Sequence, residues 1–157
     1  MIIRAWRIVK QRLLKDAFSG EGSRLAGSRW TSKGVRVVYA SESISLAALE
    51  VMANAPSYEI LKNYVCVPLD FDSKLVTELD VTGLHKDWRE DPPPAELKEI
   101  GDEWALKERT VIMKVPGAIV HQESNYIINP IHPEFRKIKI GVGEAFVFDK
   151  RLRGTRS

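Results

Sequence analysis

The sequence predicts an α+β fold in a single domain. Its 157 residues match the length of one domain. Segments with the composition of strands and of helices follow one another without regular alternation, which argues against a doubly wound parallel sheet. With 44% apolar and 29% charged residues, the chain has an ordinary globular composition and is long enough to bury a core without disulfides or metals.

The first quarter of the chain is expected to supply two strands. Residues 2–9 and 35–40 are rich in apolar and β-branched side chains, and each segment predicts a strand. Residues 10–18 predict a short helix. Residues 19–28 predict a loop, because three glycines and three serines interrupt the pattern there.

A buried helix is expected next, over about residues 44–54. Its side chains are apolar nearly all round, which is typical of a helix enclosed by the core. Either Ser43 or Ser45 can cap its first turn, and Pro56 ends it.

The second half of the chain predicts further strands around one long helix. That helix covers about residues 95–108, and Gly101 is a weak point that allows two shorter helices instead. The last two strands are expected to pair with each other across a glycine-containing turn. The predicted strands are residues 64–71, 75–79, 110–115, 137–141 and 144–148.

Charge and cysteine content indicate a soluble cytoplasmic protein. The net charge of +3 is too small to imply nucleic acid, and the basic cluster in residues 150–157 (Lys150, Arg151, Arg153, Arg156) is most simply a solvated tail. The single cysteine, Cys66, cannot form an internal disulfide and is expected to be a small buried hydrophobe. Arg4 and Arg7 interrupt the apolar start, so no signal peptide is predicted, and no segment is long enough to span a membrane.

Familiar metal and nucleotide motifs are absent from the sequence. No phosphate-binding loop, dinucleotide fingerprint or nucleophile elbow occurs. His85, His121 and His132 match no zinc spacing, and Cys66 has no cysteine partner, so we expect no metal site and interpret the histidines as loop or surface residues.

Two charged residues stand out, and each has a structural alternative. Glu50 is the one charge of the apolar helix, where a buried carboxylate is costly unless it is paired; it could equally form a structural ion pair or occupy a narrow solvated edge. Arg29 follows the glycine- and serine-rich segment and could offer its planar fork to a phosphate, or it could stack on Trp30 at the surface.

Four uncharged polar residues are further candidates. Tyr39 ends a strand and could offer its ring to a flat ligand, or be an ordinary core aromatic. Ser124 and Asn125, with Asn129, could converge on a ligand or hold a turn before Pro130.

Five short motifs together resemble the RES domain family. In chain order they are Arg-Trp after a glycine-containing loop, Val-Val-Tyr-Ala-Ser, Ser-Leu-Ala-Ala-Leu-Glu, Ile-Gly-Asp-Glu-Trp and Ser-Asn-Tyr-Ile-Ile-Asn-Pro. The resemblance covers residues 4–149. The arginine, glutamate and serine that give the family its name fall on Arg29, Glu50 and Ser124. Thr31 stands where many members of the family have asparagine, but it is not one of these three residues.

The resemblance implies a fold, an activity and a partner. RES proteins are toxins paired with Xre-type antitoxins; their fold is similar to that of ADP-ribosyltransferase toxins, with a mixed sheet and flanking helices. They take NAD⁺ as a substrate rather than as a cofactor and cleave its nicotinamide–ribose bond by hydrolysis or phosphorolysis. We therefore expect the antitoxin to cover a cleft near Arg29, and a homodimer is compatible with the resemblance.

Each candidate then receives a role. Arg29 binds the diphosphate, Tyr39 packs on the nicotinamide or its ribose, and Glu50 stabilises the oxocarbenium-like ribose. Ser124, supported by Asn125, hydrogen-bonds phosphate or ribose. Arg7 is a second candidate for an anion contact, or a charge on a strand face.

Two other functions remain open at this stage. The same site would serve an ADP-ribosyltransferase that modifies a cellular protein. More remotely, a non-enzymatic nucleic-acid-binding module could use the basic tail and the tryptophans Trp30, Trp88 and Trp104.

Overall fold

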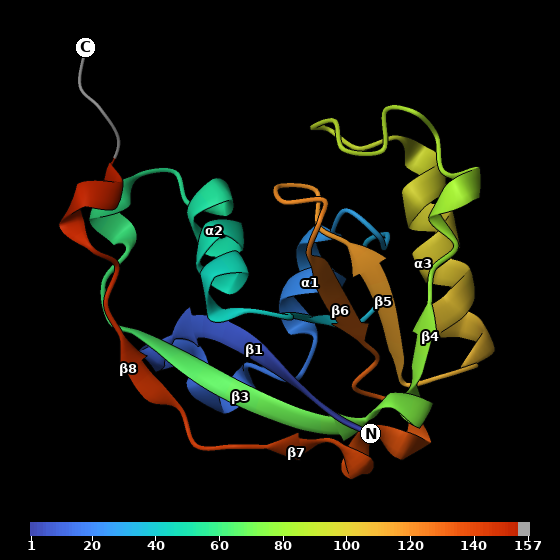
Figure 1. Ribbon diagram of the computed structural model, residues 1–157, viewed down its shortest axis with the longest axis horizontal. Helices are drawn as coiled ribbons and strands as arrows, with labels where there is room; N and C mark the ends of the chain where they lie inside the picture. Colours follow the sequence, from blue (N-terminus) through green and yellow to red (C-terminus); the bar gives the residue numbers. More distant parts are fainter. Residues whose placement is uncertain (154–157) are drawn as a thin grey trace.

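A single curved sheet organises the chain in the computed structural model, which describes residues 1–153 (Figure 1). Within these residues eight strands join in the order β4-β5-β6-β2-β1-β3-β7, and β8 lies beside β3. The strands are β1 (Ile2–Lys10), β2 (Val38–Ser41), β3 (Tyr64–Asp72), β4 (Val76–Glu78), β5 (Ile112–Pro116), β6 (Ser124–Ile128), β7 (Lys139–Ile140) and β8 (Glu144–Phe146). The helices are α1 (Glu21–Ala26), α2 (Ile44–Asn54) and α3 (Ala95–Lys107).

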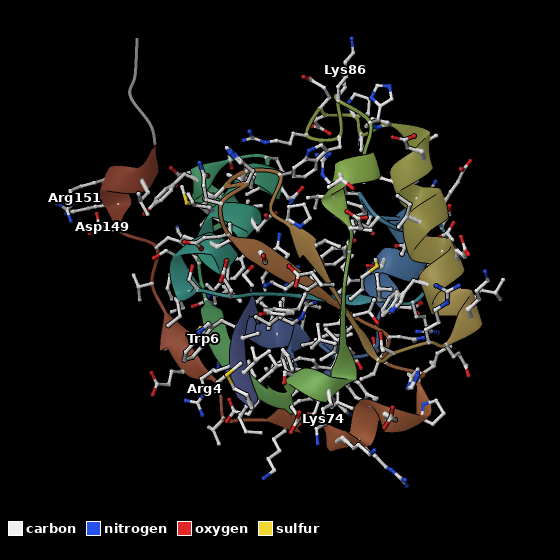
Figure 2. The ribbon with its side chains drawn as sticks, turned by 45° about the vertical axis from the view of Figure 1, so that its right-hand side comes forward. Arg4, Trp6, Lys74, Lys86, Asp149 and Arg151 are labelled. Carbon is white, nitrogen blue, oxygen red and sulfur yellow. The ribbon has the colours of Figure 1, made fainter. Side chains whose placement is uncertain are left out.

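The sheet is mixed, which confirms the predicted α+β class. β4 and β5 pair in parallel, whereas the other paired strands are antiparallel. The longest ladder joins β1 to β3 over nine residue pairs, from Ile2↔Asp72 to Lys10↔Tyr64. At its outer side Arg4 forms a bidentate ion pair with Asp70 and lies 5.8 Å from the ring of Trp6 (Figure 2).

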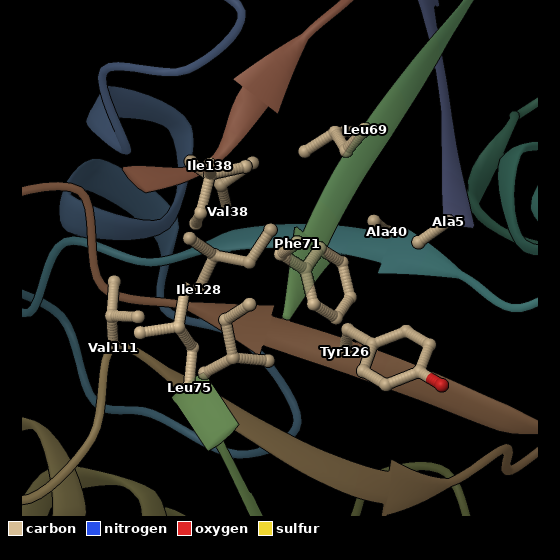
Figure 3. Packing of buried hydrophobic residues seen from close by; sticks show 11 residues of the cluster. Ala5, Val38, Ala40, Leu69, Phe71, Leu75, Val111, Tyr126, Ile128 and Ile138 are labelled. Carbon is tan, nitrogen blue, oxygen red and sulfur yellow. The ribbon is translucent and has the colours of Figure 1, made fainter. Parts of the chain in front are cut away.

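The two faces of the sheet pack against different groups of side chains. One face buries the cluster shown in Figure 3, which includes Phe71 and Tyr126 in edge-to-face contact at 5.3 Å. On the opposite face, α2 covers β1 and β3 through Ala47 and Ala48, and α3 covers β5 and β6 through Leu97 and Trp104. Each large apolar side chain buried in this way contributes about 1.5–3 kcal/mol.

Strand alternation decides which side chains lie on the helix-covered face. In β2, Val38 and Ala40 enter the cluster of Figure 3, so Tyr39 and Ser41 point to the opposite face, beside α2 and α3. The central strand β2 therefore carries two polar groups into the region between the two helices.

The helix α2 begins where the sequence allows but is less buried than expected. Ser43 is its cap, with the hydroxyl accepting the backbone N–H of Leu46 at 3.0 Å. Its buried side chains are Leu46, Ala47 and Ala48, whereas Leu49 is 38% exposed. The prediction of a helix buried all round is therefore wrong: α2 lies on the sheet with one face and leaves apolar side chains exposed on the other.

Two further predictions need correction, and a third holds in a different helix type. The loop predicted at residues 19–28 contains α1, a six-residue helix bounded by Gly20 and Gly27, both at positive φ. The short helix predicted over residues 10–18 is present as a 3-10 helix over Gln11–Asp16. The strands predicted at 137–141 and 144–148 exist in shortened form as β7 and β8, but each pairs with β3 and not with the other.

The remaining predictions concern the cysteine, the histidines, membrane-spanning helices and the basic tail. Cys66 is buried, as expected. His85 and His121 are exposed, but His132 is buried and bonds the Glu108 carbonyl and the Glu134 N–H, so its interpretation as a surface residue is wrong. Residues 1–153 contain no helix long and apolar enough to cross a membrane. Of the predicted basic tail, Lys150–Arg153 form a 3-10 turn, and Arg156 lies outside the described residues.

Candidate active site

The Glu50 carboxylate is held from the sheet by two polar side chains. Asn125 of β6 donates its Nδ2 hydrogen to Glu50 Oε1 at 2.9 Å. The Ser41 hydroxyl of β2 donates to Asn125 Oδ1 at 2.6 Å. Ser41 and Asn125 face each other in the antiparallel ladder, and both are buried. The carboxylate of Glu50 is thus joined to the sheet rather than to a basic side chain.

Tyr39 lies between Glu50 and the loop that carries Arg29. Its hydroxyl is 2.6 Å from Ser28 Oγ, which in turn is 2.6 Å from Thr31 Oγ1. Burial raises the pKa of Tyr39 to about 12; the nearby Glu50 carboxylate adds to this rise, and the Arg29 guanidinium opposes it. The Glu50 and Arg29 charges therefore shift the pKa of the Tyr39 phenol in opposite directions, and the phenol stays neutral at physiological pH.

Arg29 is fixed by the segment that precedes α3. Its Nη1 donates to the backbone carbonyls of Trp88 at 3.0 Å and Glu90 at 2.8 Å. The neighbouring Trp30 is buried and its ring centroid lies 6.4 Å from that of Trp88. The same segment carries the exposed Lys86 beyond the end of α3 (Figure 2). Trp30 thus packs inward, and the guanidinium of Arg29 is oriented by backbone carbonyl oxygens.

The helix α3 holds the loop of residues 28–32 through two charged side chains. The Asp102 carboxylate accepts the Ser32 N–H at 2.8 Å and the Ser32 hydroxyl at 2.6 Å. Lys98 Nζ donates to the Ser28 carbonyl and, at 3.4 Å, to that of Thr31. These contacts fix the backbone on both sides of Arg29.

Gly101 lets α3 approach this loop closely. A Cβ added at Gly101 would lie 1.7 Å from the Trp30 carbonyl oxygen, a backbone atom that cannot move alone. The glycine expected to weaken the helix is therefore inside one continuous helix, at the point of contact with the loop.

Two of the candidate residues point to the other face of the sheet. Arg7 donates from Nε to the Ala17 carbonyl at 2.9 Å and from Nη1 to the Tyr39 carbonyl at 2.8 Å. Burial lowers the pKa of Arg7 to about 10, and its guanidinium lies 6.0 Å from the Phe18 ring. These contacts give Arg7 a structural role, and its contact with an anion stays a prediction.

Ser124 opens β6 one residue before Asn125. Because Tyr126 packs into the cluster of Figure 3, strand alternation places the Ser124 side chain on that face, away from Asn125. Its backbone exchanges hydrogen bonds with Glu42: the Ser124 N–H donates to the Glu42 carboxylate, and its carbonyl accepts the Glu42 N–H. The structure thus brings together Arg29, Tyr39, Glu50 and Asn125, but not Ser124.

The charges of this arrangement fit an anionic ligand that develops positive charge elsewhere. A guanidinium and a carboxylate have opposite effects on the pKa of a phenol that stays neutral. The described residues contain no cluster of histidine, cysteine or acidic side chains that could hold a metal ion.

Comparison with known proteins identifies the family. The family model of the RES domain matches residues 4–149. The chain belongs to the RES domain family. It is a homologue of "Toxin Res" from Photorhabdus laumondii, with 34% identity over 84% of this chain and 85% of that protein. It is also 31% identical, over 94% of both chains, to the "Prs ADP-ribosylating toxin" of a Sphingobium species.

A solved structure supports the fold of this RES domain. The chain superposes with a TM-score of 0.76 on a chain of the MbcT–MbcA toxin–antitoxin complex of M. tuberculosis, over 94% of this chain and 85% of that chain. The sequence identity is 17%, so this likeness shows the fold alone.

Sequence reasoning missed several residues of the RES site. Ser41 was given no role, although it ends the quoted motif Val-Val-Tyr-Ala-Ser, and Ser28 was in a predicted loop. Lys98 and Asp102 lie in a helix rich in charges, where none stands out. Membership in the quoted motifs was the available signal, for Ser41 as for Asp102 in Ile-Gly-Asp-Glu-Trp.

Proposed function

We propose that this RES domain is the toxin of a toxin–antitoxin pair and that it cleaves the nicotinamide–ribose bond of NAD⁺. The observation that carries the proposal is the position of Tyr39: it shares a face of the sheet with Asn125, which holds the Glu50 carboxylate, and its hydroxyl contacts Ser28 beside Arg29. The homologues named as toxins, one of them ADP-ribosylating, support the same conclusion.

The reaction requires charge stabilisation more than proton transfer. The bond between the ribose C1′ and the pyridinium nitrogen breaks, and its electron pair leaves with neutral nicotinamide. The ribose becomes oxocarbenium-like, and water or phosphate attacks C1′; an attacking water loses a proton. Glu50 supplies negative charge to this cation, and its Asn125 bond fixes the carboxylate before reaction.

Arg29 and Tyr39 would bind the two ends of the substrate. Arg29 uses Nη1 for backbone carbonyls, which leaves the donors on Nε and Nη2 for the diphosphate. Neutral Tyr39 packs on the nicotinamide or its ribose. Contacts of Ser124 and Arg7 with phosphate or ribose stay predictions from the sequence, since both side chains lie on the face of the sheet opposite Glu50.

An antitoxin is the expected protein partner. An uninhibited NAD⁺-consuming enzyme would harm its own cell, so a tight cytoplasmic inhibitor is required. The M. tuberculosis neighbour was solved in a toxin–antitoxin complex. We propose that an Xre-type antitoxin covers the side of the site formed by Arg29, where an acidic segment would complement the guanidinium.

A second activity uses the same site. The Sphingobium relative is named an ADP-ribosylating toxin, which favours a protein side chain as the alternative acceptor at C1′. The roles of Arg29, Tyr39 and Glu50 would be unchanged, and only the acceptor would differ.

Incubation of the purified chain with NAD⁺ tests the proposal. We expect chromatography to show nicotinamide together with ADP-ribose or, with phosphate present, its 1″-phosphate; a mass increase on an added protein would identify transfer instead. Glu50→Gln should lower the rate by ~10²–10³-fold, the usual contribution of an electrostatic stabiliser. Glu99→Gln, at an exposed position of α3, is the matched control and should keep full activity. Full activity in folded Glu50→Gln, or no nicotinamide from the folded wild type, would contradict the proposal.

A further inference from the structure

Two buried polar side chains connect neighbouring strands at the site. Ser41 is 4% exposed and Asn125 is 8% exposed. They are directly opposite each other in the antiparallel pairing of β2 and β6, so their side chains share one face of the sheet. Buried polar groups are costly unless they are hydrogen-bonded, and both are satisfied through each other and Glu50.

The Ser41 hydroxyl holds the end of the Asn125 amide that faces away from Glu50. An ionised carboxylate can only accept hydrogen bonds, so Glu50 itself sets the amide orientation, with the Nδ2 hydrogens towards Oε1 and Oδ1 away from it. The Ser41 hydroxyl then donates to Oδ1 at 2.6 Å. Asn125 is thereby held at both ends of its amide, and without Ser41 the amide keeps only its bond to Glu50.

The partner of Glu50 is neutral, which matters for a charge-stabilising carboxylate. Among residues 1–153, no lysine, arginine or histidine forms an ion pair with Glu50. A basic partner would fix the carboxylate but cancel much of its charge, whereas an amide fixes it and leaves the charge in place.

We propose that Ser41 and Asn125 are positioning residues that hold Glu50 Oε1 and leave Oε2 to the ribose of the substrate. This inference rests on the proposed NAD⁺ cleavage and extends it to two residues that do not carry the reacting charge. Ser41 acts through Asn125, and Asn125 acts through Glu50.

Steady-state kinetics on the full chain tests the consequence. Ser41→Ala leaves the Asn125 amide with only its bond to Glu50, and we expect kcat to fall roughly tenfold with KM changed less than twofold, because the lost alignment matters in the transition state. Ser41→Thr keeps a hydroxyl and should recover most of kcat. Ser45→Ala, an exposed serine on α2, is the matched control and should match the wild type. Equal kcat in Ser41→Ala and wild type would overturn the proposal.

A double-mutant cycle separates positioning from a general structural effect. If Ser41 works only through Glu50, adding Ser41→Ala to Glu50→Gln should change the residual rate by less than about twofold. A further tenfold loss in the double variant would show that Ser41 acts elsewhere and would overturn the proposal.

A measurement without substrate keeps this inference distinct from the proposed function. In NMR spectra, the side-chain amide of Asn125 should show slow hydrogen exchange in the wild type and exchange at least tenfold faster in Ser41→Ala, with Ser45→Ala unchanged. If the wild type releases no nicotinamide but the amide is protected in this way, the NAD⁺ proposal fails while the positioning of Glu50 holds. Unchanged exchange in Ser41→Ala would refute the positioning itself.

Discussion

The helices α2 and α3 cover the same face of the sheet but serve the candidate site in different ways. α2 presents Glu50 directly, and the carboxylate is bonded by Asn125 from β6. α3 contributes none of the candidate site residues named from the sequence; it holds the loop of Arg29 through Lys98 and Asp102. One helix carries the carboxylate proposed to stabilise the ribose cation, and the other fixes the backbone around the arginine proposed to bind the diphosphate.

Because of this difference, mutations near α2 and mutations near α3 should change different properties of the protein. Changes around Glu50 should act on kcat, since a charge-stabilising group matters most in the transition state. Changes at the contact between α3 and the loop should act on stability and on KM, because the diphosphate that we propose Arg29 to bind is present throughout the reaction. Three predictions test this division, starting with the largest effect.

Replacing Gly101 with alanine should disrupt the contact between α3 and the loop. The added Cβ would lie 1.7 Å from the Trp30 carbonyl oxygen, so the helix or the loop must move. Overpacking of this kind costs about 3 kcal/mol, at the upper end of the usual range, which corresponds to a fall in Tm of roughly 6–12 °C for a domain of this size. Thermal unfolding measures the effect.

Gly22→Ala is the control for this substitution. No atom lies within 4 Å of the Cβ position at Gly22, which is inside α1 at an ordinary φ. Alanine there should leave Tm unchanged or raise it slightly, since it lowers the entropy of the unfolded chain. A Tm for Gly101→Ala equal to that of Gly22→Ala would show that α3 does not constrain the loop.

Removing the Asp102 carboxylate should weaken substrate binding more than turnover. Asp102→Ala deletes both hydrogen bonds to Ser32, at a cost of about 1–3 kcal/mol, and loosens the loop that orients Arg29. We expect KM for NAD⁺ to rise about tenfold while kcat falls less than threefold. Glu103→Ala, an exposed change on the same helix, should leave both constants near the wild type. If Asp102→Ala lowered kcat and left KM unchanged, the proposal that α3 acts on substrate binding and not on turnover would be wrong.

The fold was predictable where a long pattern extended over a whole element. β1 and β3 follow segments rich in apolar side chains, and α3 has the length of a helix. β6 was missed because it begins with Ser124 and Asn125 and ends just before Asn129 and Pro130, which together suggested a turn. Its strand character comes from pairing with β2 and β5, a contact between distant segments that no local pattern contains.

Short elements failed for a related reason. α1 has only six residues, too few for intrinsic helix stability, and it is held by the Glu21 carboxylate through Arg24 and Arg36. Of these, Arg36 lies beyond the helix, so the pairing is tertiary. The partner choice of β7 and β8 likewise depends on the free side of β3 and not on the turn between them.

The site was predictable where a residue conflicted with its surroundings. Glu50 is the one charge in an apolar helix, and this conflict is visible in the amino-acid sequence alone. Ser41, Lys98 and Asp102 conflict with nothing around them in the sequence, and their importance lies in distances across the fold. Residues that act on the substrate can thus be visible locally, whereas residues that position them are visible only in three dimensions.

The smallest predicted effect tests whether Tyr39 joins the two halves of the site. Its hydroxyl bonds to Ser28 of the loop held by α3, and the Glu50 charge from α2 adds to the effect of burial. The folded protein keeps the Tyr39 proton up to a pKa of about 12, whereas the unfolded chain loses it near 10. The unfolded state then binds fewer protons between these values, so this stabilising contribution is complete below pH 10 and is lost as the pH rises towards 12.

Tyr39→Phe removes that titration and leaves the other tyrosines in place. Relative to the phenylalanine variant, the wild type should lose about 1 kcal/mol of unfolding free energy between pH 9 and pH 11. Urea unfolding of both proteins at pH 9, 10 and 11 measures this difference. Adding Glu50→Gln to both proteins should reduce the difference only slightly, because burial is the larger cause of the shift and the carboxylate a smaller one. Parallel curves for wild type and Tyr39→Phe would mean that the phenol is solvated in the folded protein, and α2 and α3 would then act on the site independently rather than through a shared tyrosine.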